Sequence, residues 1–209
     1  MRTRLVVIAC LLAPAVDLAG CVSLKRTPEA RFFTLRAVLE PAVAAPAAAP
    51  AGSQVGLLPV LVPGHLERPQ LVTWAGPGEL RIDEYLRWAE PLDEGVGRTL
   101  GEDLDALLPA HPVTRSPWPV AVVPFCRVRV ELRVFGPQES GDVLLEGRWA
   151  LLPRGEGRPF VHRSTSLRRP LSGKPGDPAA GVEAMSALLA DLAKEIAAAV
   201  DALPAEPET

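Results

Sequence analysis

Apolar and polar residues alternate most regularly in residues 126–135, which predicts a β-strand, because successive side chains of a strand point to opposite faces. One face is expected to carry the apolar residues Val128, Val130, Leu132 and Val134. The other face is expected to carry the charged residues Arg127, Arg129, Glu131 and Arg133. This charged face is interpreted as solvated, with contact to phospholipid headgroups or to a partner as the alternative. Residues 143–152 are predicted to form the hairpin partner, and residues 160–168 a weaker third strand.

Apolar residues at helical spacing predict two amphipathic helices. The first begins at Pro91, whose missing N–H suits a first helical turn, and runs to about residue 108. Asp93 and Glu94 then lie in the first turn, where the helix dipole favours negative charge. The second helix covers about residues 179–203, and its apolar stripe comprises Val182, Met185, Leu188, Leu189, Leu192, Ile196, Val200 and Leu203. This stripe is expected to form a major part of the core.

Three segments nearer the N-terminus are predicted to be extended. Residues 31–36 form the first of these. Residues 54–63 are apolar nearly throughout, which favours a central strand, although Pro59 predicts a bulge or an edge register. Residues 69–83 are predicted to form two short extended runs around the turn signal Gly76-Pro77-Gly78.

Together these elements predict an α+β (α/β-like) fold, with one mixed β-sheet and two main amphipathic helices packed on it. A single domain is expected over residues 31–203. It contains an Ala/Pro-rich loop at 40–53, where repeated prolines forbid a helix. Residues 204–209 are expected to form a disordered tail.

The N-terminal residues 1–20 have the features of a lipoprotein signal peptide. Two arginines precede an apolar run that is too short to span a bilayer, and the run ends in Leu18-Ala19-Gly20-Cys21, a lipobox pattern. Cys21 is therefore the predicted lipidation site, and residues 21–30 are predicted to form a lipidated tether. Val22, in place of an aspartate after the cysteine, favours the outer membrane of a bacterium, with the domain on the periplasmic face.

Composition and the remaining polar residues narrow the function. The formal net charge is −3, so no basic excess favours nucleic acid. His65, His111 and His162 are scattered without metal-ligand spacing, and no phosphate-binding loop or nucleophile elbow is present. No catalytic residue, metal or other cofactor is predicted. Cys126 is interpreted as a small buried hydrophobe rather than a nucleophile.

The segment YLRWAEPLDE, residues 85–94, leaves three interpretations open. In the first it starts the helix, with Glu90 capping the first N–H groups and Arg87 pairing with Glu84 or Glu90. In the second, its tryptophan and neighbouring side chains dock onto a partner. In the third, Glu90 and Asp93 form the acid–base pair of an envelope hydrolase.

Several motifs together resemble one known family. The segments Arg68-Pro69-Gln70 and Arg87-Trp88-Ala89-Glu90-Pro91-Leu92 occur at the mutual spacing expected of the PqiC/YmbA family. These are ABC-type transport auxiliary lipoproteins, also described as membrane integrity-associated transporter subunits. Residues 127–135 and 145–152 resemble the family's later strand pair, and residues 188–200 its last helix. The resemblance marks as interface or structural residues Arg68, Pro69, Gln70, Arg87, Trp88, Glu90, Pro91, Leu92, Arg148 and Trp149.

The resemblance implies a role without catalysis. A protein of this type is expected to be anchored in the outer membrane and to act as an auxiliary or docking component of an MCE/ABC-type system that moves lipid between membranes and supports envelope integrity. The implied partners are an MCE-domain protein and an ABC permease and ATPase of the same system, and a homo-oligomer is compatible with such a role. The alternative is a periplasmic lipid carrier, or an assembly factor of another envelope complex.

Overall fold

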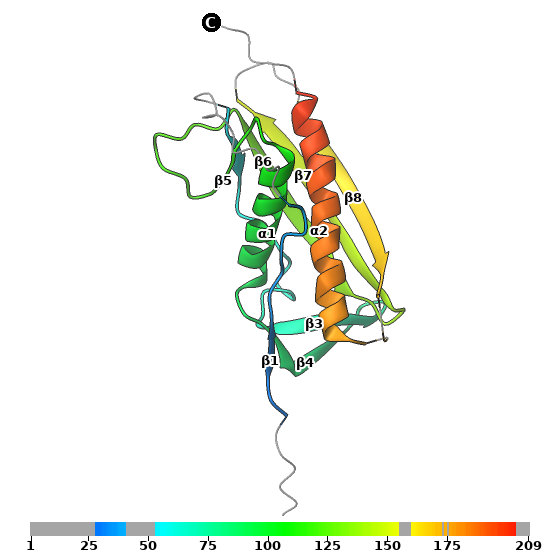
Figure 1. The fold of residues 1–209 in the computed structure, drawn as a ribbon. Coiled ribbons are helices and arrows are strands. Elements are labelled where there is room, and N and C mark those ends of the chain that lie inside the picture. The colour runs from blue at the N-terminus through cyan, green and yellow to red at the C-terminus, as the bar shows by residue number, and fades with distance from the viewer. Residues whose placement is uncertain (1–27, 41–52, 155–159, 173, 175, 204–209) are drawn as a thin grey trace, which may run out of the picture.

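The computed structural model describes residues 28–40, 53–154, 160–172, 174 and 176–203 (Figure 1). Its elements in chain order are β1 (Arg31–Phe33), β2 (Val55–Leu57), β3 (Gln70–Gly76), β4 (Glu79–Trp88), α1 (Leu92–Leu107), β5 (Val113–Arg115), β6 (Cys126–Pro137), β7 (Asp142–Pro153), β8 (Val161–Pro170) and α2 (Pro178–Asp201). The predicted signal peptide, Cys21, most of the Ala/Pro-rich loop and the C-terminal tail lie outside the described residues.

The strands form two mixed sheets, in the orders β1-β4-β3 and β5-β2-β6-β7-β8. The predicted α+β class is confirmed, but the strands expected in a single sheet are divided between two. The β3–β4 hairpin does not extend the large sheet. Instead Trp74 of β3 reaches the end of β6 through one isolated bridge to Gln138, and its ring lies against Gly136. Hydrophobic periodicity along the chain does not specify which strand edges pair, so it could not predict this division.

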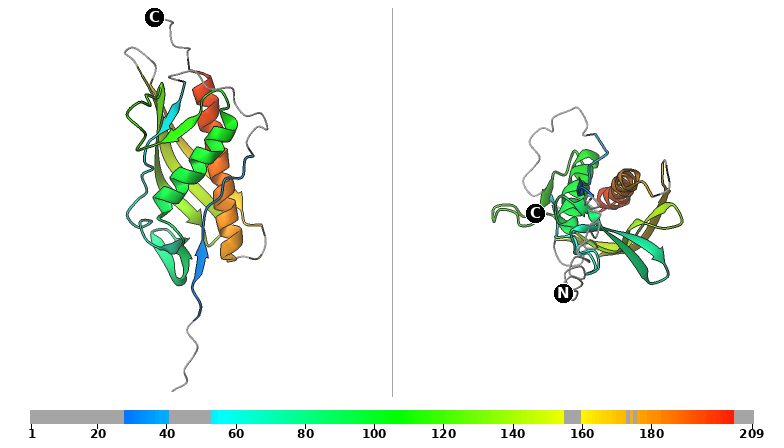
Figure 2. Two further views of the ribbon diagram at one scale, coloured as in Figure 1. Left: turned by 60° about the vertical axis from the view of Figure 1, so that its left-hand side comes forward. Right: turned by 90° about the horizontal axis from the view of Figure 1, so that it is seen from below.

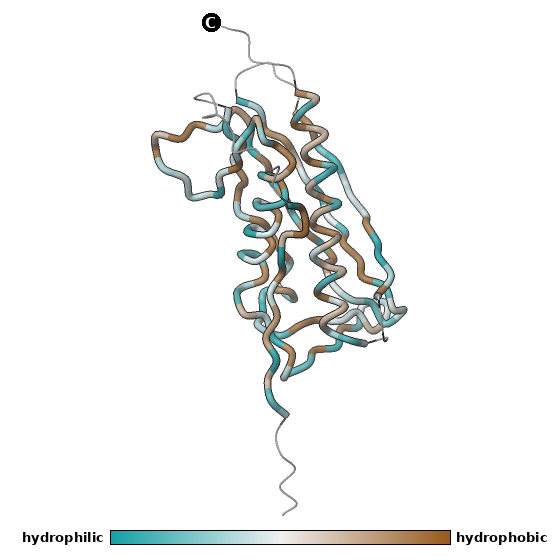
Figure 3. The backbone as a smooth tube through the Cα atoms, in the orientation of Figure 1, coloured by the Kyte–Doolittle hydropathy of each residue, from teal (hydrophilic) through white to brown (hydrophobic). Residues whose placement is uncertain are grey.

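Both helices cover one face of the large sheet, with α2 lying along β6, β7 and β8 and α1 beside α2 (Figures 1 and 2). The core between them is dense, and its largest fully buried side chains include Trp149, Phe135, Leu145 and Met185. Hydrophobic residues accordingly run along α2 and the central strands (Figure 3). Helix α2 begins where the Asp177 side chain accepts a hydrogen bond from the Ala179 N–H at 3.0 Å, with proline as its first residue.

Strand β2 is central, between β5 and β6, as its apolar sequence predicts, but it ends at Leu57. Pro59 has no N–H to donate and interrupts the ladder. Pairing with β6 resumes at Leu61, whose N–H donates to the Val130 carbonyl at 3.0 Å and whose carbonyl accepts from Leu132 at 2.8 Å. The predicted strand 54–63 is therefore one segment with a proline gap.

A bulge in β6 changes the predicted alternation near its end. The register against β7 shifts between Leu132 and Val134, so one extra residue enters β6. Phe135 is consequently buried in the core, whereas Val134, which the strict alternation placed there, is only half-buried. The bulge also requires Gly147 on β7, because a side chain there would lie 2.5 Å from the Glu131 carbonyl oxygen.

The segment after β1 crosses the two helices as an extended strap, residues 34–39, and does not continue the predicted strand 31–36. The Arg36 N–H donates to the Ser186 hydroxyl of α2 at 3.2 Å. The N–H groups of Val38 and Leu39 both donate to Oδ1 of Asp103 on α1, each at 3.0 Å. These bonds fix the N-terminal part of the domain to both helices.

Candidate docking groove at the junction of β4 and α1

The segment 85–94 ends a strand before it begins a helix. Residues 85–88 complete β4, and α1 starts at Leu92 after a short turn. The Trp88 N–H donates to the Pro69 carbonyl at 2.7 Å, and the Ala89 N–H donates to the Phe33 carbonyl at 2.8 Å. Three segments that are distant in sequence are thereby joined by backbone hydrogen bonds. The prediction that this decapeptide starts a helix holds only for its last three residues.

Trp88 is a core residue. Its side chain is 8 % exposed and belongs to the main hydrophobic cluster, and its register partner on β1 is Phe33. Leu92, in the first turn of α1, is buried in the same cluster. Both side chains therefore hold the junction of β4 and α1 in place by packing in the core. Trp88 also contributes to the groove described below.

Glu90 joins the strap to α1 and does not cap the helix. Its Oε1 accepts hydrogen bonds from Nη2 of Arg98 at 2.6 Å and from the Thr34 hydroxyl at 2.9 Å. Arg98 also donates to the Leu35 carbonyl at 2.8 Å. The hydrogen bond from Arg98 holds the pKa of Glu90 below its ordinary value, so this carboxylate stays ionised.

Of the two expectations for this segment, these contacts correct one and confirm the other. The N-cap position of α1 is Pro91, which makes no side-chain capping bond, so the capping role predicted for Glu90 is wrong. Of the two partners considered for Arg87, the structure shows Glu84: the guanidinium Nε donates to its backbone carbonyl at 2.9 Å, and Nη2 lies 3.7 Å from its carboxylate. Arg98 and Thr34 carried no sequence signal, because their spacing to Glu90 matches no local motif.

Most of the residues in the two signature segments line one groove of about 520 Å³. Its wall consists of Glu67, Arg68, Pro69, Trp88, Ala89, Glu90, Pro91, Leu92 and Asp93. Within the described part of the chain, Nε of Arg68 is buried without a hydrogen-bond acceptor. Gln70 and Arg87 are register partners beside the groove but do not line it, and Gln70 bonds to Glu84 at 3.1 Å.

Arg148 and Trp149 are not part of this groove. They lie on opposite faces of β7 in the large sheet. Arg148 is exposed and binds Glu131 through two hydrogen bonds of 2.9 and 3.0 Å. Trp149 is buried against the helices, where its Nε1 donates to the Thr165 hydroxyl at 3.2 Å. The Arg-Trp pair thus stabilises the sheet and its helix-covered face.

The arginine face predicted on β6 lies on the side of the large sheet that the helices do not cover. Arg127, Arg129 and Arg133 are exposed, and Arg133 pairs with Glu146 across the strands at 2.8 Å. Exposed cross-strand ion pairs of this kind are usual on the solvent face of an antiparallel sheet.

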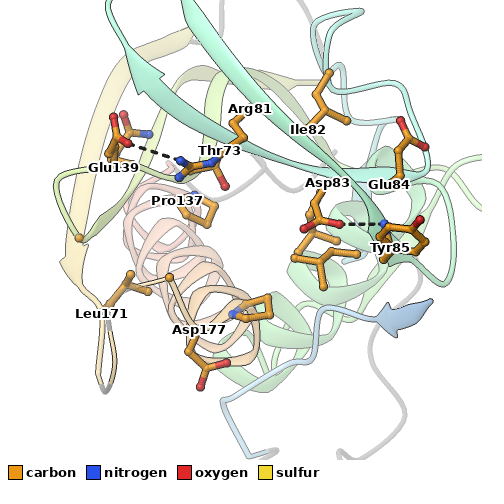
Figure 4. A pocket seen from close by; sticks show the side chains of 16 residues that line it. Thr73, Arg81, Ile82, Asp83, Glu84, Tyr85, Pro137, Glu139, Leu171 and Asp177 are labelled. Carbon is orange, nitrogen blue, oxygen red and sulfur yellow. Dashed lines mark hydrogen bonds and ion pairs between the residues drawn. The ribbon is translucent and has the colours of Figure 1, made fainter. Parts of the chain in front are cut away.

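A second cavity, of about 560 Å³, lies between the small sheet and the start of α2 (Figure 4). Ile82 and Tyr85 of β4, Leu171 after β8 and Asp177 before α2 line it. The sequence did not predict this cavity, because its lining residues come from separate segments with no shared motif.

Among the described residues, no group of three or more histidine, cysteine, aspartate or glutamate side chains could hold a metal ion. His65 lies edge-on to Trp74, and His111 and His162 each lie near a phenylalanine ring. Cys126 is fully buried, as predicted. None of the helices in this part of the chain has the length and apolar character needed to cross a membrane.

Comparison with known proteins places the chain in a family. The family model described as "ABC-type transport auxiliary lipoprotein component" matches residues 33–197. The chain therefore belongs to this family, which is the PqiC/YmbA type that its motifs resemble. The family is described as a component of transport systems, and not as an enzyme.

Solved structures agree on the fold. A crystal structure of an uncharacterized protein matches with a TM-score of 0.66 at 20 % identity, covering 83 % of this chain and 99 % of that chain. Protein XCC0632 from Xanthomonas campestris, assigned to the family DUF330, matches with a TM-score of 0.64 at 18 % identity, covering 82 % of this chain and 94 % of that chain. Among curated proteins, none matches the chain.

Proposed function

We propose that this protein is a lipoprotein of the bacterial outer membrane that faces the periplasm and acts as a docking component, without catalysis, of an MCE/ABC-type lipid transport system. Its partners are an MCE-domain protein and the ABC permease and ATPase of the same system. The family membership supports the link to ABC-type transport. The lipobox ending at Cys21 supports an acyl anchor, because the two or three chains of a lipoprotein cysteine hold a protein far more firmly than one chain.

The observation that carries the docking role is the position of the signature motifs. The segments 67–69 and 88–93 come from different elements, yet they form the two sides of one groove. The hydrogen bond from the Trp88 N–H to the Pro69 carbonyl joins these two sides, and the ion pair of Glu90 with Arg98 fixes the second side to α1. A preformed groove of this kind binds a partner segment at a lower entropic cost than a loop that must first become ordered.

The groove also offers specific polar contacts. The buried Nε of Arg68 lacks an acceptor among the described residues, and an acceptor on the partner would satisfy it. Pro69, Pro91 and the edge of Trp88 supply apolar surface next to it. An apolar anchor beside a charged rim is the usual composition of a protein-binding hot spot.

The two other interpretations have less support. A carrier that encloses lipid needs an apolar cavity, but side chains such as Trp149, Phe135 and Leu188 fill the space between the large sheet and the helices. The cavity beside the small sheet is lined in part by the charged residues Arg81, Asp83 and Glu84. A hydrolase that uses Glu90 as a general acid needs a carboxyl that holds its proton near neutral pH. Arg98 keeps Glu90 ionised instead.

A photo-crosslinking experiment tests the docking role. The crosslinking amino acid replaces Glu67, which is exposed at the rim of the groove, and in a control it replaces Ser166, which is exposed on β8. In cells that contain the whole transport system, we expect position 67 to crosslink to the MCE-domain protein and position 166 to remain free of it. Equal crosslinking at both positions, or none at position 67, would count against the groove as the docking site.

A further inference from the structure

Apolar side chains are exposed at the end of the domain that the small sheet forms. Phe32 on β1 is 64 % exposed, and Tyr85 and Ile82 on β4 are 38 % and 36 % exposed. In the parallel register of β1 and β4, Phe33 faces inward with buried Trp88, whereas Phe32 lies opposite the half-exposed Arg87. Phe32 therefore projects away from the core. Tyr85, two residues before Arg87, belongs to the same strand as Ile82, and both line the cavity between the small sheet and the start of α2 (Figure 4).

The small sheet is also the part of the domain closest to the predicted anchor along the chain. Cys21 precedes Pro28, where the described chain begins, by seven residues, so an extended chain spans at most about 25 Å between them. Helix α2 has 24 residues and is about 36 Å long. It runs from the end with the small sheet to the opposite end of the domain (Figure 1). The opposite end therefore cannot rest on the anchoring leaflet while the tether stays attached.

The charges around these apolar residues are close to balanced. Arg31, Arg81 and Arg87 lie on β1 and β4 together with Glu79, Asp83 and Glu84. Arg81 pairs with Glu139 at 3.4 Å, and Arg87 lies 3.7 Å from Glu84. No basic excess is available to attract anionic lipid. Aromatic rings with a polar edge or neighbour, by contrast, favour the interface between lipid headgroups and acyl chains.

We propose that the end of the domain formed by the small sheet rests on the phospholipid leaflet that holds the acylated Cys21, with Phe32 and Tyr85 at the headgroup level. The proposal rests on the acyl anchor of the proposed function. The occupant is the leaflet itself, because the short tether brings this end, and not the far end, within reach of the lipid. Contact at this sheet fixes the orientation of the domain, which a tether alone leaves free.

The test uses the full, acylated chain in vesicles of phosphatidylethanolamine and phosphatidylglycerol that contain a nitroxide-labelled phospholipid. An environment-sensitive fluorophore is attached at a single position in each of three variants, Phe32→Cys, Tyr85→Cys and Val120→Cys. Val120 is almost fully exposed in the loop between β5 and β6, at the opposite end of the domain. Cys126 is buried, and the unsubstituted chain measures any labelling of it.

We expect the nitroxide lipid to quench the label at positions 32 and 85 several-fold more than at position 120, and we expect added salt to leave this quenching unchanged. Equal quenching at all three positions on vesicles that retain the protein would overturn the contact while leaving the anchor intact. A blue shift that grows with protein concentration without lipid quenching would assign the surface to a second protein copy instead. Release of the chain from the vesicles would overturn the anchor and, with it, this proposal.

Discussion

Replacement of Trp88 by alanine tests whether the signature tryptophan is a structural residue or only a docking residue. The ring is 8 % exposed and packs in the main cluster, so the substitution removes most of a side chain that buries roughly 150–250 Å². At about 25 cal/mol per Å², the lost burial corresponds to roughly 4–6 kcal/mol as an upper value. Large-to-small core substitutions of aromatic residues typically cost about 3–5 kcal/mol, and we expect a loss in that range.

The assay is equilibrium urea unfolding of the soluble chain that begins after Cys21, followed by circular dichroism of the helices. Trp88→Phe is the matched control, because it keeps an aromatic ring in the site and is expected to cost clearly less. The Trp88 N–H bond to Pro69 belongs to the backbone and survives both substitutions. A loss below about 1 kcal/mol for Trp88→Ala would refute the core assignment, because a change of that size is typical of surface positions.

Three further changes have defined outcomes. Glu90→Gln should destabilise the fold by about 1–2 kcal/mol at pH 7, because a charge-assisted hydrogen bond to Arg98 is lost at a partly exposed site. The folded-state pKa of Glu90 lies below its unfolded value, so the wild-type advantage should shrink in urea titrations as the pH falls through the acidic range. Burial raises the pKa of Asp103, so the pH dependence that Asp103 contributes has the opposite sign. The stability of the wild-type protein should decline as the pH rises through that raised pKa. The Asp103→Asn variant should lack this decline, because an asparagine has no proton to lose, and its Oδ1 can still accept the hydrogen bond from the strap. Cys21→Ala should move the protein from the membrane pellet to the soluble periplasmic fraction, and persistent membrane association of that variant would contradict the anchor.

The spacing of apolar and polar residues predicted helices and strands well where one face of the element is buried in the core. Helix α2 spans 178–201 against a predicted 179–203, and all eight residues of its predicted stripe are buried or half-buried in the core. The β6–β7 hairpin and the central position of β2 were also predicted. Alternating apolar residues indicate a strand with one buried face, and a continuous apolar run indicates a strand with both faces buried. The departures occur at Pro59 and at the β6 bulge, where a missing donor and one extra residue interrupt an otherwise regular ladder.

Contacts between distant segments could not be predicted in the same way. Glu90 binds Thr34 across 56 residues and Arg98 across eight, and neither partner shares a helix or strand with Glu90. The small sheet meets the large one where the Trp74 ring lies against Gly136, and the linear sequence does not indicate this contact. The motif residues Arg68 and Trp88 were identified from the sequence, but only the fold shows that they line a common groove while Arg148 lies elsewhere.

The proposed function depends most directly on the chemical state of the mature N-terminus. Mass spectrometry of the N-terminal peptide, taken from protein extracted from bacterial membranes, measures that state. We predict that Cys21 is the first residue and that it carries two or three fatty acyl chains. A mature chain whose first residue carries no acyl group would contradict it.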